Sequence, residues 1–183
     1  MSHKLGMIAR GNPRSATGRK VAVLAADDVD AAGLQAMRSA LLSADAKVRV
    51  LSTRLGELRS AGGGTVAVDD LLVATPSIMF DAVLVPCGTD SITALRNSGD
   101  AVHFVREALK HAKPVSTLGE RVDLLVAAAV LPAATTVSTG LFARPAGVST
   151  AAAGAVAALA PTFLADISVH RQKDRFNIDH MAA

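Results

Sequence analysis

The chain of 183 residues has one cysteine, no tryptophan, no tyrosine and only five phenylalanines. A single cysteine, Cys87, excludes an internal disulfide framework and a zinc site built on several thiolates, and it suits a reducing cytoplasm. The shortage of aromatic rings counts against binding of single-stranded nucleic acid, whose bases stack on such rings. Nucleic acid is therefore not an expected partner.

Long hydrophobic runs and a strong charge bias are also missing. Apolar stretches such as Val122 to Leu131 are too short to span a bilayer, and Met1 to Arg10 lacks the apolar core of a signal peptide. Lys plus Arg number 19 and Asp plus Glu 16, so the isoelectric point of about 9.4 reflects an excess of only three positive charges. This small excess implies no particular partner, and no membrane is expected as a partner.

Strand and helix patterns alternate once the domain begins at Lys20. Lys20 to Ala26 is a continuous apolar run, typical of a parallel strand covered on both faces, and a second strand is expected at Lys47 to Leu51. Between them a helix begins with Asp30 as its N-cap. Its expected buried stripe consists of Leu34, Met37, Leu41 and Leu42. This order is a βαβ unit, which predicts a doubly wound parallel sheet.

Glycines interrupt the pattern between Thr53 and Val68, where a small hairpin insertion is expected. The run Gly62 to Gly64 could also be taken for a phosphate cradle. No Lys followed by Ser or Thr comes next, however, and no helix clearly opens there. We therefore interpret the run as the turn of the hairpin.

The second half continues the alternation. Further strands are expected at Ala82 to Val85, Pro114 to Leu118 and Thr136 to Ser138. Further helices are expected at Asp100 to His111, burying Val102, Val105 and Leu109, at Arg121 to Ala129, and at Thr150 to His170. Within the last helix Pro161 must begin a new turn or kink the old one. We divide the chain into an N-terminal arm (residues 1–19), one domain (20–170) and a charged tail (171–183).

Three segments resemble successive parts of one family. They are GRKVAVLAADDVDAAGL at Gly18 to Leu34, MFDAVLVPCGTDS at Met79 to Ser91, and DAVHFVREALKHAKPVSTLGE at Asp100 to Glu120. The family is the C-terminal domain of large-subunit haem catalases, and the similarity extends from Arg10 onward. The resemblance implies a flavodoxin-like α/β fold with helices on both faces of the sheet, related to class I glutamine amidotransferases and to PfpI and DJ-type proteins.

In the active relatives of that fold, a Cys stands on a sharp turn after the strand that corresponds to Pro114 to Leu118. The resemblance puts Gly119 at this position, and glycine has no side chain with which to form a covalent intermediate. Glu120 falls where many relatives carry His, so a pair of Cys and imidazole is absent as well. We call this turn, at Gly119 and Glu120, the elbow. Because it is degenerate, we expect no catalytic residue there.

Two other places could carry chemistry. Cys87 follows a strand at the edge where α/β sheets place ligands, but a lone Cys more often acts as a small hydrophobe. Asp27, Asp28 and Asp30 follow the first strand, and Asp30 best matches the acidic residue of active relatives. Without a nucleophile to activate, these carboxylates are better explained as caps of a helix N-terminus.

The histidines do not form a metal-binding pattern. The chain has five, at His3, His103, His111, His170 and His180, and no two lie four residues apart on one helix. His103 and His111 are two helical turns apart, too far to bind one ion. We expect no metal and no cofactor in this chain.

Two functions remain. The first is a non-catalytic accessory domain of a large-subunit catalase, an enzyme of oxidative stress that dismutates hydrogen peroxide to water and oxygen. Its partners would be the catalase core, a second copy of the chain or unfolded client proteins, and its roles stabilisation, oligomer assembly or chaperone-like holding of clients. The second is a stand-alone hydrolase or stress protein of the PfpI or DJ type. Gly119 favours the first, and haem is expected only in a separate core, because catalases hold the iron through a tyrosinate and this chain has no Tyr.

Overall fold

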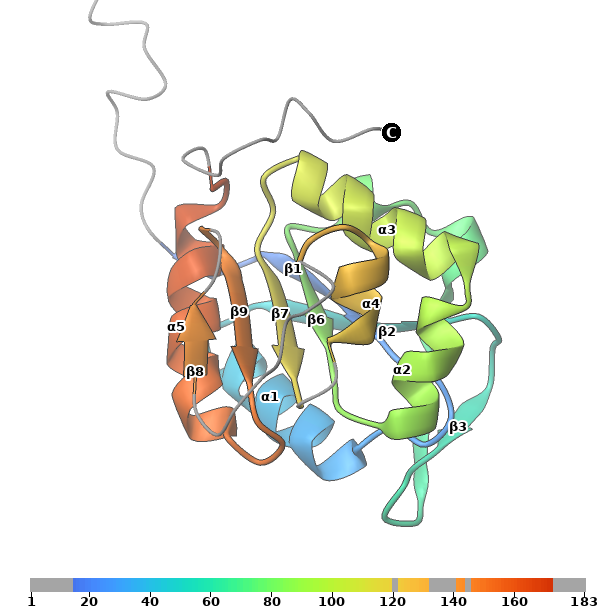
Figure 1. Cartoon of the computed structure of the whole chain (residues 1–183). Coiled ribbons are helices and arrows are strands. Elements are labelled where there is room, and N and C mark those ends of the chain that lie inside the picture. Colours follow the sequence, from blue (N-terminus) through green and yellow to red (C-terminus); the bar gives the residue numbers. More distant parts are fainter. Residues whose placement is uncertain (1–14, 120–121, 132–140, 144–145, 173–183) are drawn as a thin grey trace, which may run out of the picture.

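The computed structural model describes residues 15–119, 122–131, 141–143 and 146–172 (Figure 1). A seven-stranded sheet runs through the described part in the order β5-β2-β1-β6-β7-β9-β8, and every pairing in it is parallel except that of β8 with β9. Its strands are β1 (Lys20–Leu24), β2 (Lys47–Ser52), β5 (Asp70–Leu71), β6 (Ala82–Val85), β7 (Val115–Leu118), β8 (Leu141–Ala143) and β9 (Val148–Ala151). The predicted doubly wound, flavodoxin-like sheet is confirmed.

Helices cover both faces of the sheet (Figure 1). The helices are α1 (Ala31–Ser43), α2 (Thr89–Arg96), α3 (Gly99–Lys110), α4 (Asp123–Ala127) and α5 (Val156–Val169), with two 3₁₀ turns, η1 (Leu72–Ala74) and η2 (Ser77–Met79). Buried side chains of α1 and α5 share one core with one face of the sheet, and those of α2, α3 and α4 share a second core with the other face. Within the described residues, none of the helices is long and apolar enough to cross a bilayer.

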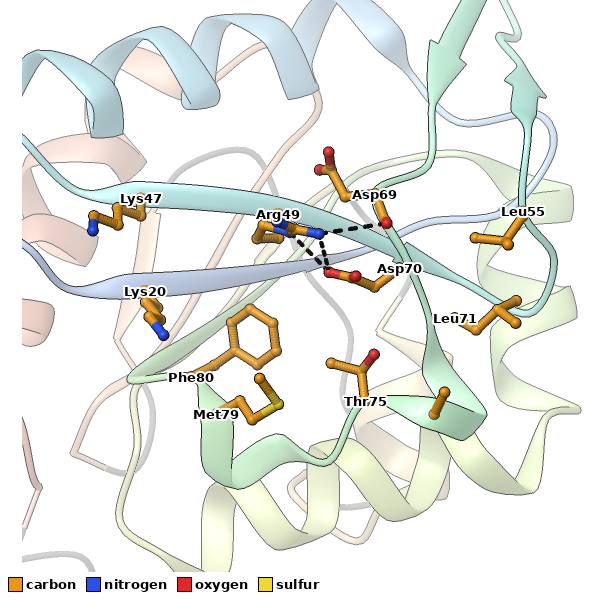
Figure 2. Close-up of a pocket in the computed structure, with 11 residues that line it drawn as sticks. Lys20, Lys47, Arg49, Leu55, Asp69, Asp70, Leu71, Thr75, Met79 and Phe80 are labelled. Atoms are coloured by element: carbon orange, nitrogen blue, oxygen red, sulfur yellow. Dashed lines mark hydrogen bonds and ion pairs between the residues drawn. The ribbon is translucent and has the colours of Figure 1, made fainter.

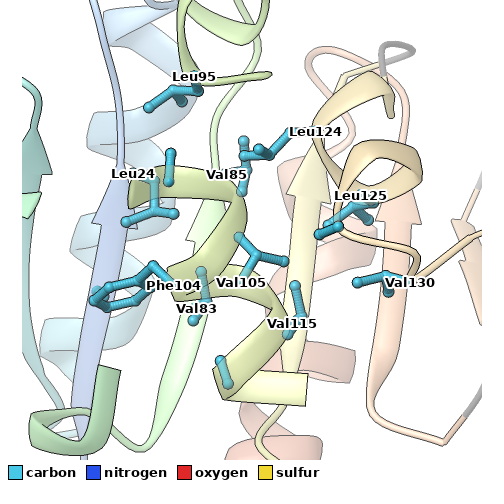
Figure 3. Packing of buried hydrophobic residues seen from close by; sticks show 14 of the residues in the cluster. Leu24, Val83, Val85, Leu95, Phe104, Val105, Val115, Leu124, Leu125 and Val130 are labelled. Atoms are coloured by element: carbon cyan, nitrogen blue, oxygen red, sulfur yellow. The ribbon is translucent and has the colours of Figure 1, made fainter. Parts of the chain in front are cut away.

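The central strands bury both of their faces. In β6, Val83 and Val85 face the core under α2, α3 and α4, whereas Ala82 and Leu84 face the core under α1 and α5. Figure 3 shows Phe104 and Val105 of α3 packed over Val83 and Val115. Each such side chain contributes about 1.5 to 3 kcal/mol through burial. This explains why continuous apolar runs, rather than alternating patterns, mark these strands in the sequence.

The hairpin predicted between Thr53 and Val68 is confirmed. It consists of β3 (Glu57–Arg59) and β4 (Thr65–Ala67), which pair antiparallel. Gly63 and Gly64 have φ of +88° and +84°, a conformation that glycine adopts without steric cost, and they make the turn between the two strands.

The structure corrects several expectations about the helices. Leu42 was expected in the buried stripe of α1 but is 49% exposed, whereas the other three members are buried. In α3, Val105 and Leu109 are buried as expected and Val102 is only partly buried. The helix expected from Thr150 begins only at Val156, because Val148–Ala151 forms β9, and it continues through Pro161 without ending. α2, β5, β8 and β9 were not predicted.

Other predictions fall on residues outside the described ranges. These are the strand at Thr136 to Ser138, Glu120 at the elbow, most of the arm and most of the tail.

Candidate functional site

The carboxyl ends of β1, β6 and β7 bring together the residues that the sequence singled out. These strands are neighbours in the sheet, and their ends carry Asp27 to Asp30, Cys87 and Gly119. The amide of Asp30 donates to the carbonyl oxygen of Cys87 at 2.7 Å, which ties the first loop to the second. The amide of Gly119 donates to the carbonyl oxygen of Ala151 at 2.6 Å, which ties the third to β9.

Gly119 is glycine for two geometric reasons. Its φ of +119° lies where side chains are rarely tolerated. A Cβ placed on it would lie 2.7 Å from Sγ and 2.8 Å from Cβ of Cys87. The half-buried Cys87 side chain therefore occupies the space into which a residue at the elbow would project its own side chain.

Asp30 caps α1, as the sequence predicted. Its Oδ1 accepts from the amides of Ala32 and Gly33, both at 3.1 Å, so two of the four unpaired donors at the helix start are satisfied. Its Oδ2 lies only 2.5 Å from the position of a Cβ on Gly33, so glycine is needed for the carboxylate to fold back over the helix.

Asp27 and Asp28 serve other elements than α1. Oδ2 of Asp28 accepts from the amide of Asp90 at 3.2 Å, in the first turn of α2, so this carboxylate supports a helix from a distant part of the sequence. Asp27 accepts from the amide of Arg59 at 2.8 Å and pairs with Arg54 at 2.7 Å and with Arg59 at 3.6 Å. The backbone hydrogen bond from Arg59, aided by the two guanidinium groups, lowers the pKa of Asp27 although partial burial opposes the shift. The prediction that all three carboxylates serve one helix is therefore wrong for these two.

The described histidines lie apart from the elbow. His103 and His111 border a hollow beside α3, and Nε2 of His170 lies 3.0 Å from Oδ1 of Asp81 at the other end of the sheet. His3 and His180 fall outside the described residues. In the described part of the chain, no three His, Cys, Asp or Glu side chains are grouped closely enough to hold a metal ion.

A groove that the sequence did not reveal begins at the amino ends of β1 and β2 and extends to Leu55 and Leu71 beside the carboxyl end of β2 (Figure 2). Its volume is about 620 Å³, and it is bordered by β1, β2 and β5 on one side and by η1, η2 and Phe80 on the other. We call it the lysine groove, after Lys20 and Lys47, which line it together with Arg49, Leu71, Met79 and Phe80. Those residues come from four separate segments, and only the register of β1 with β2, which the sequence does not show, places the two lysines side by side.

A buried lysine beside η2 was also missed. Lys113 is only 1% exposed, and its Nζ donates to the carbonyl oxygen of Ser77 at 2.6 Å, which fixes η2 to the turn before β7. Burial, aided by the charge of Arg171, lowers the pKa of Lys113 to about 8.

The amino-acid sequence of the chain is similar to the C-terminal parts of long catalases. Residues 17–177 match the family described as the C-terminal domain found in long catalases. The chain is 40% identical over 126 residues to catalase HPII of Mycobacterium avium, covering 68% of this chain and 18% of that protein. It is 31% identical over 129 residues to catalase C of Rhizobium meliloti, covering 70% and 18% respectively. The chain thus spans less than a fifth of the length of these curated relatives.

Solved structures show the same fold at low identity. A mutant of a DJ-1 superfamily protein from Salmonella typhimurium is similar with a TM-score of 0.74 at 18% identity, over 88% of this chain and 95% of that one. Oxidized DJ-1 of Toxoplasma gondii is similar with a TM-score of 0.69 at 16% identity, over 90% and 96%. These likenesses establish the flavodoxin-like fold.

Proposed function

The chain belongs to the family of C-terminal domains found in long catalases, and from this membership we propose that it is a non-catalytic accessory domain of a haem catalase. The parent reaction would be dismutation of hydrogen peroxide to water and oxygen, carried out by the part of the polypeptide that this chain does not span. The domain would contribute by packing on the catalase core, and through it to stability and oligomer assembly. A cytoplasmic location fits a chain with one cysteine.

The elbow is the observation that carries this proposal. In a fold whose active members place a nucleophile after the strand corresponding to β7, this chain has Gly119, and the side chain of Cys87 occupies the adjoining space. Asp30 is the other residue that could take part in catalysis, but one of its carboxylate oxygens accepts hydrogen bonds from the first turn of α1. A domain that maintains a full α/β core without a nucleophile at this position acts most simply through its surface.

Haem is assigned to the core for a chemical reason. Catalases hold their iron through a tyrosinate, and the chain contains no Tyr. We therefore expect the isolated chain to release no oxygen from peroxide after addition of hemin. A Soret band at one haem per chain, with oxygen release, would contradict the assignment.

The association itself can be tested in a relative. Catalase HPII of Mycobacterium avium would be prepared intact, without the segment that matches this chain, and with this chain in place of that segment. We expect truncation to shorten the half-life of peroxide dismutation at elevated temperature and the chimera to restore much of the loss. Sedimentation velocity reports assembly in parallel. If the truncated and chimeric proteins do not differ in half-life or in assembly, accessory packing is not the function.

Two further roles need separate tests. Holding of clients predicts that the isolated chain delays the thermal aggregation of an unrelated enzyme. A stand-alone hydrolase of the PfpI or DJ type is the second candidate function, favoured by the Cys87 thiol lying at the elbow. It predicts turnover of ester, amide or glyoxal substrates that Cys87→Ser abolishes, and such a result would replace the accessory proposal.

A further inference from the structure

The lysine groove shares no lining residue with the elbow, on which the proposed function rests. It runs along β1 and β2 from Lys20 and Lys47 toward Leu71 (Figure 2). The elbow follows β7, which is three strands away from β2 in the sheet. Its volume of about 620 Å³ is in the range of small-molecule sites. Along β2 the lining extends from Lys47 to the level of Asp70, which pairs with Leu51. This is roughly 13 Å at about 3.3 Å per residue, so the groove suits an elongated ligand.

One end of the groove has unbalanced positive charge. Lys20 and Lys47 are directly paired in the register of β1 with β2, so both side chains project from the same face of the sheet. Both are exposed, and neither ammonium group forms an ion pair or hydrogen bond among the described residues. Like charges placed side by side in a sheet are unfavourable, so an anion bound between them would relieve a cost that the fold otherwise carries.

Two carboxylates, those of Asp69 and Asp70, line the groove, and both accept hydrogen bonds, as does Asp81, which follows Phe80. Oδ2 of Asp81 accepts from the amide of Lys20 at 2.9 Å, and its Oδ1 faces His170 and Arg19. Oδ2 of Asp70 accepts from Arg49, with distances of 2.8 Å to Nε and 2.7 Å to Nη2. Oδ2 of Asp69 accepts from the amide of Val50 at 2.7 Å.

The opposite wall is apolar. Phe80 is buried, and its ring is fixed by Phe104 of α3 at a centroid distance of 6.0 Å. Met79 is 52% exposed, and it lies with Phe80 across the groove from the strands that carry the lysines (Figure 2). Leu71 of β5 continues the apolar surface toward the far end.

We infer that the lysine groove binds a small amphipathic carboxylate, with its anionic head between Lys20 and Lys47 and its apolar body against Met79 and Phe80. Two charge-assisted hydrogen bonds would hold the head, and burial of the ligand's chain against the apolar wall would supply the remaining affinity. A flexible, unbranched acyl chain matches the elongated shape better than a bulky ring system does.

Isothermal titration of the full chain with decanoate, below its micelle concentration, tests this inference. We expect saturable binding of one decanoate per chain. Acetate has the head without the body, and decyltrimethylammonium has the body with the opposite charge, so neither should bind in the same range. Equal binding of decyltrimethylammonium and decanoate would show that the lysines do not select the ligand, and the inference would be wrong.

Matched variants locate the site. Lys20→Gln with Lys47→Gln should weaken decanoate binding by about tenfold or more, because two charge-assisted hydrogen bonds are lost. Arg38→Gln with Arg96→Gln removes the same net charge from α1 and α2 and should leave the affinity unchanged. Met79→Glu should abolish binding, whereas Ile78→Glu, at an exposed neighbour that borders the hollow beside α3, should not.

Circular dichroism confirms that each variant is folded before its titration is interpreted. Absence of saturable decanoate binding to the wild-type chain overturns the inference, as does equal affinity of the double lysine variant. Sedimentation distinguishes the other occupants. If the chain forms dimers that Met79→Glu dissociates, or cosediments with anionic phospholipid vesicles but ignores free decanoate, the groove is an interface with a second copy or with a lipid surface.

Discussion

The sulfur atom of Cys87 lies 2.7 Å from the point that a Cβ on Gly119 would occupy. Side chains on both residues, which are 32 positions apart in the sequence, would therefore overlap. Only Cys87 has a side chain, and it occupies this space. The elbow is closed by packing as well as by the identity of residue 119.

Gly119→Ala should lower the free energy of unfolding by about 1 to 3 kcal/mol, because the added methyl group would overlap Cys87 and the residue has a positive φ. Urea denaturation measures the loss. Gly18→Ala is the control, since Gly18 has φ of +74° but no atom within 4 Å of the point that an added Cβ would occupy, so it reports backbone strain alone. Equal losses in the two variants would show that the contact with Cys87 costs nothing.

Asp30→Ala should destabilise the protein by about 1 kcal/mol, because the amides of Ala32 and Gly33 would lose their acceptor. Hydrogen exchange should accelerate at the first turn of α1. Asp30→Ser retains a capping oxygen and should be close to wild type in stability. If Asp30→Ser were as unstable as Asp30→Ala, the carboxylate would matter for a reason other than capping.

Two neighbouring residues of β7 should respond to substitution in opposite directions. The buried hydroxyl of Thr117 has no hydrogen-bond partner within the described residues, so Thr117→Val should raise the free energy of unfolding by about 1 kcal/mol. Ser116 and Ser149 share a buried hydrogen bond of 2.5 Å between β7 and β9, so Ser116→Ala should cost about 1 to 3 kcal/mol by leaving the Ser149 hydroxyl unpaired. Chemical denaturation of both variants measures this contrast, and a change of the same sign in both would contradict it.

The stability of the wild type should rise with pH relative to that of Lys113→Met. The pKa of Lys113 is lowered from 10.5 to about 8 by burial, so between these values the unfolded chain holds more protons than the folded one. Folding is therefore favoured as pH increases, by roughly 3 kcal/mol at most for a shift of this size. Denaturation at pH 7.5 and pH 10 measures the difference, and the absence of Tyr removes another group that titrates there. Lys110→Met controls for loss of a lysine, and parallel behaviour of Lys113→Met and wild type would contradict the prediction.

The sequence predicted those elements whose own residues carry the signal. β1 and β6 are apolar on both faces, and α3 has a clear buried stripe, so runs and periodicity identified them. α2 buries only Ser91, Ile92 and Leu95, too few apolar residues for a stripe. β9 buries Ser149 and Thr150, whose polarity disguises a buried strand, and the partner of Ser149 lies on β7.

In the candidate sites, too, some features could be predicted from the sequence, whereas others depend on contacts between distant residues. The missing nucleophile at Gly119 was predicted from a resemblance, and Asp30 from local capping preference. The neighbour that fills the elbow, Cys87, comes from another strand and could not be inferred from local sequence. The pairing of Lys20 with Lys47 depends on strand register, and the burial of Lys113 on the position of Ser77, 36 residues away.

The shortness of β5 has a consequence for the behaviour of the protein at high concentration. A long, flat outer strand presents unpaired N–H and C=O groups on which a foreign strand can grow, which is the start of amyloid-like polymers. β5 ends the sheet after two residues, and the Arg49 and Asp70 charges stand beside it. A foreign strand would find almost no template on this flank, so concentrated solutions of the protein should not polymerise by extension of the sheet from β5.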